Sequence, residues 1–407
     1  MVGLTVFTIN MVESDGGDMK ILRITVEGAP LFKKRLEMDF YAKKRVSDRD
    51  KQEMFQLSTN IYIQQAIAFA GINASGKTST LKMISFVMEM LKCTPINKIE
   101  SREILGRSSL VTINSYFSVE ENNGYDHVYR LETMISSYND EFGRIAYKIE
   151  HETLWKKTLK NSSKKNLTNF AMDKPISNRD GFKQYLIDDI SFIHFYNRAW
   201  KNQLRLIDLR VLTNYNLPMR INPPMELVRY LDPSVKDLHY ELINDSYRIH
   251  LTLESEHEVI LYDYDDLYKY LSSGTVKGIN VFMAAFAVLK KGGYLIVDEL
   301  ENHFNKSIVQ NFIRLFLNPA INKKGAALIF SSHYIELLDI FERCDFIYIN
   351  RHQNGGLTVE NLSTILTRND IKKSEAYQSN LLNGTAPEYE DYHEWLKRLR
   401  KMIDEDN

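Results

Sequence analysis

The most constraining feature of the chain is a glycine-bounded segment at positions 71–78, which reads Gly-Ile-Asn-Ala-Ser-Gly-Lys-Thr. The apolar run Ile61–Ala70 before it predicts a buried strand. After it, apolar residues recur every three or four positions over Ser79–Leu91, which predicts a helix. A strand, a glycine-bounded loop and a helix in this order distinguish a phosphate-binding loop from a chance match.

Each residue type in this loop suits a phosphate ligand. Glycines let the backbone curve so that its N–H groups point at phosphate oxygens, and the helix N-terminus favours an anion. The ammonium of Lys77 is expected to reach the β- and γ-phosphates, and the hydroxyl of Thr78 suits a Mg²⁺ ligand. The predicted phosphate-binding residues are Gly71, Asn73, Ala74, Ser75, Gly76, Lys77, Thr78 and Ser79.

A second motif supplies carboxylates. The apolar strand Leu295–Val297 ends in Asp298 and Glu299, which is a Walker B arrangement. We expect Asp298 to hold Mg²⁺, directly or through water, and Glu299 to polarise the attacking water. Asp and Glu are also common helix caps, but the phosphate-binding loop in the same chain favours the catalytic interpretation.

Two further segments lie next to predicted helices or strands at positions where their side chains can bind a phosphate. Ser272, Ser273 and Gly274 precede the apolar helix predicted over Ile279–Leu289, and a helix N-terminus can bind an anion. Ser-Ser-Gly is also an ordinary turn and helix cap. His333 follows the predicted strand Ala327–Ser332, where it can donate a hydrogen bond to a γ-phosphate or to the attacking water, although a lone histidine is more often structural.

Bulk composition narrows the class of protein. The 407 residues include 52 Lys and Arg against 53 Asp and Glu, so the charge balance gives no sign of a nucleic-acid or membrane partner. No apolar run approaches the ~20 residues of a membrane span. Cys93 and Cys344 stand in no metal or redox spacing, and we expect them to be reduced, buried thiols of a cytoplasmic protein.

The pattern along the chain predicts several segments. Strands are expected over 21–26, 35–40, 111–119, 125–135 and 144–152, a hairpin over 247–253 and 259–264, and terminal helices over 371–382 and 387–402. The expected domains are a flexible leader (1–18), an N-terminal half with the loop and a β meander (19–155), an inserted lobe (156–240), a C-terminal half (241–361) and C-terminal helices (362–407). The inserted lobe is expected to contain a mobile Lys/Asn/Ser-rich loop over 159–183.

In this order, the four motifs resemble the ABC-type ATPases. The string Asp-Glu-Leu-Glu-Asn-His at 298–303 is similar to the pattern of the SMC/OLD-like branch, within the AAA-family ATP-binding proteins. The resemblance implies an α/β fold: a P-loop NTPase core, ABC-ATPase-like, with an antiparallel β subdomain and a helical lobe insertion. It also implies ATP and Mg²⁺ as cofactors. The signature Leu-Ser-Ser-Gly-Thr departs from the common Leu-Ser-Gly-Gly-Gln at Ser273 and Thr275.

By the same resemblance, two chains form a homodimer, or a higher oligomer built on it, that encloses two ATP molecules. Ser273 and Gly274 of one chain would face the γ-phosphate held by the other, and Asn302 and His303 would lie in the loop that crosses the dimer. Long coiled coils and a C-terminal nuclease domain are absent from the sequence pattern. Compact ATPases of this kind resemble the ATPase components of bacterial anti-phage and abortive-infection systems, in which a separate effector or toxin protein acts.

Two other hypotheses stay open from the sequence. The cluster Lys156, Lys157, Lys160, Lys164 and Lys165 is a candidate nucleic-acid contact for a repair-type ATPase that clamps DNA, although such a cluster is more often a solvated face. A scaffold that binds ATP without turnover is the other hypothesis, and the presence of both Lys77 and Glu299 argues against it.

Overall fold

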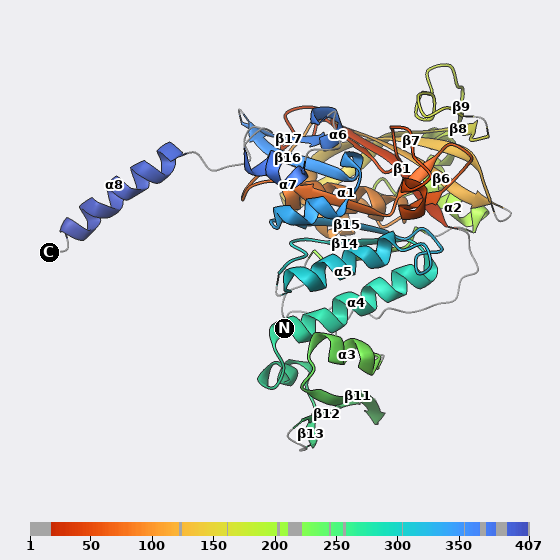
Figure 1. The fold of residues 1–407 in the computed structure, drawn as a ribbon. Coiled ribbons are helices and arrows are strands. Elements are labelled where there is room, and N and C mark those ends of the chain that lie inside the picture. Colours follow the sequence, from red (N-terminus) through yellow and green to blue (C-terminus); the bar gives the residue numbers. More distant parts are fainter. Residues whose placement is uncertain are drawn as a thin grey trace.

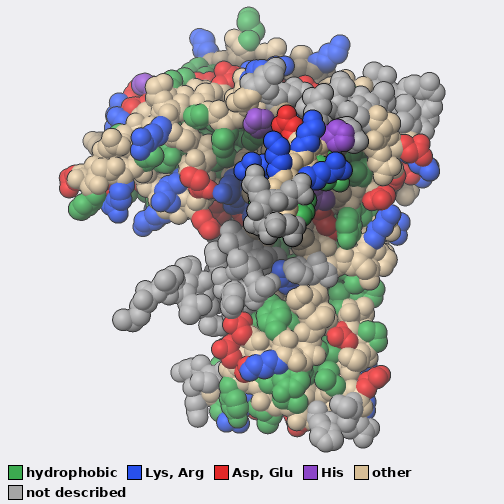
Figure 2. Space-filling view, turned by 90° about the vertical axis from the view of Figure 1, so that its left-hand side faces the viewer, with side chains coloured by type: hydrophobic (Ala, Val, Ile, Leu, Met, Phe, Trp, Pro, Cys, Tyr) green, Lys and Arg blue, Asp and Glu red, His purple; other side chains and the backbone are tan. Residues whose placement is uncertain are grey.

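The described part of the chain is arranged in layers. The computed structural model describes residues 18–121, 124–160, 162–201, 204–210, 222–243, 246–254, 258–302, 304–353, 355–366, 372–379 and 389–405. An antiparallel sheet, a buried helix, a mainly parallel central sheet and a pair of helices follow one another, and a smaller lobe lies beneath them (Figure 1). Figure 2 shows the same lobe below the wider body.

The central sheet has the strand order β10-β14-β15-β5-β16-β17, and every neighbouring pair is parallel except β16 and β17. Its strands are apolar on both faces: Ile67 and Phe69 of β5 belong to one buried cluster, Ala66 and Ala68 to the other. Continuous apolar strands are what a sheet covered on both sides requires, so the predicted α/β core is confirmed. The strands are β5 (Ala66–Ala70), β10 (Leu206–Asp208), β14 (Tyr294–Val297), β15 (Ala327–Ser332), β16 (Ile347–Gln353) and β17 (Gly356–Asn361).

The antiparallel sheet has the order β2-β1-β6-β7-β8-β9, which confirms the predicted meander. Its long strands exceed the predicted ones, because β7 and β8 pair along almost their whole length from Asn139 and Ile145 to His127 and Thr158. The strands are β1 (Met19–Glu27), β2 (Leu36–Asp39), β6 (Val111–Glu121), β7 (Gly124–Asn139), β8 (Ile145–Thr158) and β9 (Pro175–Asn178).

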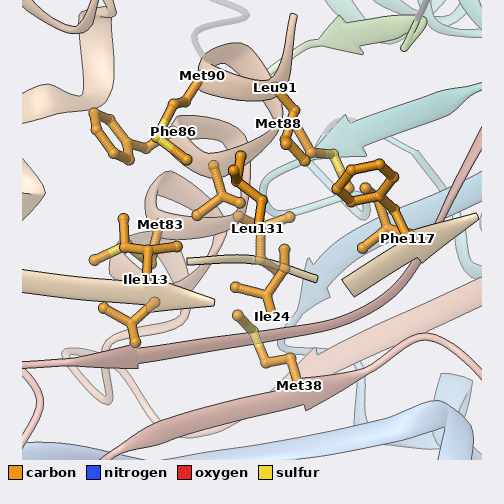
Figure 3. Close-up of a cluster of buried hydrophobic side chains, with 14 of the residues drawn as sticks. Ile24, Met38, Met83, Phe86, Met88, Met90, Leu91, Ile113, Phe117 and Leu131 are labelled. Carbon is orange, nitrogen blue, oxygen red and sulfur yellow. The ribbon is translucent and has the colours of Figure 1, made fainter. Parts of the chain in front are cut away.

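Helix α1 (Lys77–Leu91) lies between the two sheets and is buried on most of its circumference. Its side chains interdigitate with those of β1, β2, β6 and β7 (Figure 3). A helix that is apolar all round belongs in a core, and this packing fixes the helix whose first turn continues from the phosphate-binding loop. The labelled contacts include Met83, Phe86, Met88, Met90 and Leu91 of α1 against Ile24, Met38, Ile113, Phe117 and Leu131.

The other face of the central sheet is covered by α4 (Ser273–Lys291) and α5 (Lys306–Leu317). The later part of α4, with Ala284 and Val288, packs on this sheet, whereas its first turns, with Val276 and Ile279, pack in the core of the lobe. Helix α4 therefore joins the lobe to the strand that carries the Walker B carboxylates.

The lobe has its own buried cluster. It contains an antiparallel sheet in the order β11-β12-β13, which includes the predicted hairpin and adds one strand to it. Its elements are α3 (Met225–Leu231), β11 (Val235–Ile243), β12 (Ser246–Leu253), β13 (Glu258–Leu261) and the 3₁₀ helix η5 (Tyr264–Lys269).

Several expectations differ from the structure. The predicted strand Ile61–Ala70 is two strands, β4 (Tyr62–Gln64), which pairs with β3 (Met54–Gln56), and β5. A single helical insertion over 156–240 is not what the described residues form. Strand β9 extends the antiparallel sheet and β10 extends the central one, with the short α2 (Ile193–Trp200) between them. Short apolar runs predict an element but do not reveal which sheet it joins, because pairing partners are distant in sequence.

Near its C-terminal end the described chain holds three helices, α6 (Leu362–Ile365), α7 (Lys373–Gln378) and α8 (Tyr389–Glu405). Helix α7 is anchored on η6 (Ile335–Ile340), where the hydroxyl of Ser374 bonds the carboxylate of Asp339. Helix α8 projects from the body (Figure 1). The expected leader, apart from Asp18, lies outside the described residues.

Two remaining expectations concern the cysteines and the membrane. Both thiols are free, but only Cys344 is buried, and Cys93 is partly exposed, which corrects the expectation for that residue. Within the described ranges, no helix combines the length and apolar character that crossing a bilayer requires.

Candidate functional site

The loop after β5 adopts a backbone that its glycines make possible. Gly76, the residue before α1, has φ 87°, and Ala74 has φ 60°. A Cβ atom on Gly71 would lie 2.2 Å from Ser75 Oγ, and one on Gly76 would lie 2.4 Å from Leu357 Cδ1. Neither position has room for a side chain, and the left-handed conformation at Gly76 favours glycine as well. The loop therefore wraps tightly around the start of α1, as the sequence predicts.

A pocket of about 610 Å³ opens over this loop. Its wall includes two regions that the sequence did not indicate, the turn after β1 and the β16–β17 hairpin. Glu299 and His333 also line it, so the structure brings the loop, the Walker B turn and the end of β15 to one cavity. The lining residues are Pro30, Leu31, Asn73, Ala74, Ser75, Gly76, Lys77, Thr78, Ser79, Glu299, His333, His352, Gly355, Gly356 and Leu357.

The side chain of Lys77 lies along the loop and is almost fully buried. Its Nζ donates to the carbonyl oxygens of Gly71 at 2.8 Å and Ile72 at 3.1 Å. Desolvation lowers the pKa of Lys77, while the nearby Asp298, Glu299 and Glu301 act in the opposite direction. A phosphate at the loop would offer this ammonium an anionic partner in place of neutral carbonyls.

Asp298 accepts hydrogen bonds at both carboxylate oxygens. Thr78 Oγ1 donates to Oδ2 at 2.6 Å, and the hydroxyl of Ser331 donates to Oδ1. Ser331 Oγ in turn accepts the backbone N–H of Glu299 at 2.8 Å. The two residues predicted as metal ligands are thus already in contact, and their oxygen atoms are the donors that Mg²⁺ prefers. The donor set fits a magnesium ion beside the phosphate-binding loop.

Glu299 lies in the turn after β14 with φ 48°, a conformation that few non-glycine residues adopt. Such strained positions often occur at functional sites. Asn302 Nδ2 donates to its Oε2 at 2.5 Å, and His333 Nε2 is 3.5 Å from its Oε1. A carboxylate and an imidazole thus face each other at the pocket, one able to accept a proton from water and the other able to donate a hydrogen bond.

The signature residues lie elsewhere in this chain. Ser272 is the N-cap of α4, and its Oγ accepts the N–H of Thr275 at 3.0 Å, while Thr275 Oγ1 donates to Asp232 Oδ2 at 3.2 Å. The helix begins at Ser273, earlier than the predicted Ile279. None of Ser272, Ser273 and Gly274 lines the described pocket. The structure therefore does not bring them to the phosphate-binding loop of the same chain, and His303 lies outside the described residues.

Asn350 is a site residue that sequence reasoning missed. It is fully buried on β16, and its Nδ2 donates to Gly76 O at 3.2 Å and to Thr80 Oγ1 at 2.7 Å. These bonds hold the end of the loop against the start of α1. The sequence signal for Asn350 is that a polar residue ends the apolar run 346–350. No local pattern identifies the phosphate-binding loop as its partner.

Some side chains of the lysine-rich segment bond other parts of the same chain. Lys157 lies on β8, and its Nζ donates to Asn166 O and to Asn169 O, while Lys164 Nζ donates to Lys44 O. Desolvation lowers the pKa of both lysines. Lys156 lies over the ring of Tyr129. Two of the five lysines of this cluster therefore anchor backbone carbonyls instead of standing free in solvent.

Comparison with known proteins gives one family. A family model described as "AAA domain, putative AbiEii toxin, Type IV TA system" matches residues 67–339, which is more than half of the chain. The match includes the phosphate-binding loop, the signature, the Walker B residues and His333. No curated protein matches the chain significantly.

Proposed function

Since the chain belongs to the family described as "AAA domain, putative AbiEii toxin, Type IV TA system", we propose that it is an ABC-type ATPase that binds and hydrolyses ATP. The observation that carries this proposal is that five residues converge at the carboxyl ends of β5, β14 and β15. They are Lys77, Thr78, Asp298, Glu299 and His333. In open α/β sheets, ligands bind at the carboxyl ends of the strands.

We assign ATP binding to the phosphate-binding loop and the first turn of α1. Backbone N–H groups of the loop would point at the β- and γ-phosphates, and Lys77 would exchange the carbonyls of Gly71 and Ile72 for phosphate oxygens. Thr78 and Asp298 would hold Mg²⁺. Bound there, the ion neutralises the charge that develops on the phosphate oxygens.

We assign the hydrolysis step to Glu299 and His333. Glu299 Oε1 would accept the proton of an attacking water. This oxygen faces the side chain of His333 at the pocket, whereas Oε2 is bonded to the amide of Asn302. The imidazole of His333 would orient the water or bond the γ-phosphate. The amide of Asn302 fixes the orientation of the carboxylate, so the base needs no rearrangement before it acts.

We propose further that two chains complete the site. In this chain Ser273 begins a helix whose N-terminus lies on the lobe, and a helix N-terminus favours an anion. Pairing two chains so that the α4 N-terminus of one meets the phosphate-binding loop of the other would place Ser273 and Gly274 at the γ-phosphate. Helix α4 would then transmit the presence of ATP from the lobe to the Walker B strand.

The biological role that fits best is a sensor and scaffold that controls a separate effector protein, in a bacterial anti-phage or toxin–antitoxin setting. The description of the family names a putative toxin and a type IV toxin–antitoxin system. In this role a separate effector protein would be held or released according to the nucleotide state.

The DNA-clamping alternative has less support. Lys157 and Lys164 of the proposed contact segment are engaged with backbone carbonyls. On the face shown in Figure 2, positive and negative side chains are interspersed over most of the surface, and Lys and Arg side chains gather chiefly where α8 points toward the viewer. A non-specific nucleic-acid site is usually a continuous basic groove.

The test is an assay of the purified chain with ATP and magnesium. We expect release of ADP and phosphate, and light scattering that reports a larger species with ATP than without it. Hydrolysis no faster than a magnesium-and-ATP blank would contradict the enzymatic proposal. Salt-dependent binding of a DNA duplex with no effect of ATP on the oligomeric state would favour the alternative.

A further inference from the structure

A carboxylate beside the candidate active site has no role in the chemistry described so far. Glu301 is only 7% exposed, although it lies two residues beyond the proposed base in the turn after β14. Glutamate is rarely buried to this degree unless its carboxylate is paired or fully hydrogen-bonded. Its burial therefore needs an explanation in terms of the groups it contacts.

Glu301 bonds the residue that follows β15. Its Oε1 accepts the backbone N–H of His333, and the preceding residue, Leu300, donates its N–H to Ser331 O at 3.0 Å. Two successive residues of the Walker B turn therefore tie down the end of β15. The bond to a carboxylate is charge-assisted and about twice as strong as a bond between neutral groups.

The imidazole of His333 is only partly covered by the protein. About a third of its side chain is exposed, and the following residue, Tyr334, is also exposed. Its Nε2 nevertheless lies 3.5 Å from Glu299 Oε1. The position of the ring also depends on the backbone of residue 333, which is bonded to Glu301.

The second oxygen of Glu301 strengthens the case for a role at the site. Oε2 is buried and makes no hydrogen bond to any described residue. The carboxylate is close enough to act on the ammonium of Lys77, where it opposes the effect of desolvation on the pKa. Of the two carboxylate oxygens, only Oε1 makes a hydrogen bond to a described residue, and that bond is to the backbone of His333.

We propose that Glu301 is a positioning residue for hydrolysis: it fixes the backbone of His333 and so keeps the imidazole beside Glu299. The inference rests on the proposed ATPase activity and names a residue that this proposal does not use. Misplacing a reacting group by about 1 Å can cost roughly 100-fold in rate, so a lost clamp has a measurable effect.

The kinetic test compares Glu301→Ala with Glu301→Gln. We expect Glu301→Ala to lower kcat about 10- to 100-fold while the affinity for a fluorescent ATP analogue stays within about twofold of wild type, a change worth only ~0.4 kcal/mol. Glu301→Gln retains an oxygen that can accept the His333 N–H, so it should recover most of kcat. Glu336→Ala, an exposed glutamate on η6, is the matched control and should be unchanged.

A double-variant cycle decides whether Glu301 acts through His333. In a His333→Ala background, adding Glu301→Ala should lower kcat little further, because the group it positions is already missing. Equal losses in both backgrounds would overturn the proposal. Should Glu301→Ala fail to fold, Glu301→Asp, which retracts the carboxylate by one methylene, replaces it in the cycle.

Amide hydrogen exchange of the nucleotide-free protein tests the clamp without any activity. We expect the His333 amide to exchange at least 10-fold faster in Glu301→Ala, with Leu328–Phe330 of β15 still protected. Unchanged exchange at His333 would refute the clamp. Wild-type protein without ATPase activity would instead refute the proposed function, and the exchange result would then decide on Glu301 alone.

Discussion

The pocket region and the signature lobe are built in opposite ways. At the pocket, side chains from the loop, β14 and β15 already bond one another, as in the pairs Thr78–Asp298 and Ser331–Asp298. On the lobe, Ser272 and Thr275 bond each other, and Thr275 bonds Asp232. The first arrangement is a candidate site assembled inside one chain, whereas the second is a capped helix start that does not line that pocket. Two chains are needed if both regions are to touch one nucleotide.

The largest effect is expected at the pocket. Lys77→Ala removes the ammonium that lies on the loop, so hydrolysis should be abolished and ATP affinity should fall by ~2–4 kcal/mol. Steady-state phosphate release and nucleotide titration measure the two quantities. Lys82→Ala is the matched control, since Lys82 lies on the same helix and pairs with Glu103 at the surface. Wild-type turnover in Lys77→Ala would refute the assignment of the loop.

Glu299→Gln separates chemistry from binding at the same pocket. The amide keeps the shape and the bond to Asn302 but cannot accept a proton at its nitrogen, so turnover should be lost while ATP binding is retained. Uncleaved ATP should then hold two chains together, and light scattering with ATP and magnesium should report a larger species. Normal turnover would mean that Glu299 only closes the turn.

Ser273→Arg tests the lobe half of the comparison. If Ser273 completes the pocket of the other chain, the variant should bind ATP at its own loop and fail to hydrolyse it. Mixing it with Lys77→Ala produces one intact composite site per heterodimer, so part of the activity should return. Near-normal hydrolysis by the unmixed variant would confine Ser273 to the start of a helix and remove the support for a shared site.

Ser272→Ala sharpens the same point with a smaller effect. Ser272 caps α4 through the Thr275 N–H, and loss of such a cap costs about 1 kcal/mol of stability. We expect a lower melting temperature with ATP affinity at the loop unchanged. A loss of hydrolysis larger than that of Ser273→Arg would show that the cap itself, and not its neighbour, faces the nucleotide.

The smallest predicted effect is a pH dependence that belongs to the lobe alone. The hydrogen bond that His250 donates to Glu258, and after it the one that it donates to Glu241, raise the pKa of His250. A histidine whose folded pKa is raised stabilises the fold fully below its ordinary pKa of about 6.5, and this contribution is lost as pH rises through the raised value. The melting temperature should fall slightly across that window, and His250→Gln should flatten the profile. His151→Gln, an exposed histidine on β8, is the control.

The core of the fold was accessible from the sequence because its signals are local. Strand β15 follows from a short apolar run, the meander from strand-like segments close together in sequence, and the loop from glycine spacing. Errors arose where an element depends on a distant partner. The run Ile61–Ala70 looks continuous, yet Tyr62–Gln64 pairs with β3 while Ala66–Ala70 pairs with β15 and β16. No local pattern records that change of partner.

The sequence by itself determined the chemistry that separate short segments can encode: a loop able to cradle phosphate with its lysine, and two carboxylates at a strand end. The tertiary structure decided which other residues hold that chemistry in place. Asn350 reaches the loop from β16, and Glu301, after β14, reaches His333 at the end of the neighbouring β15. These contacts join residues 32 to 274 positions apart. Since a side chain's partner at such separations is set by sheet order and packing, only the folded chain shows it.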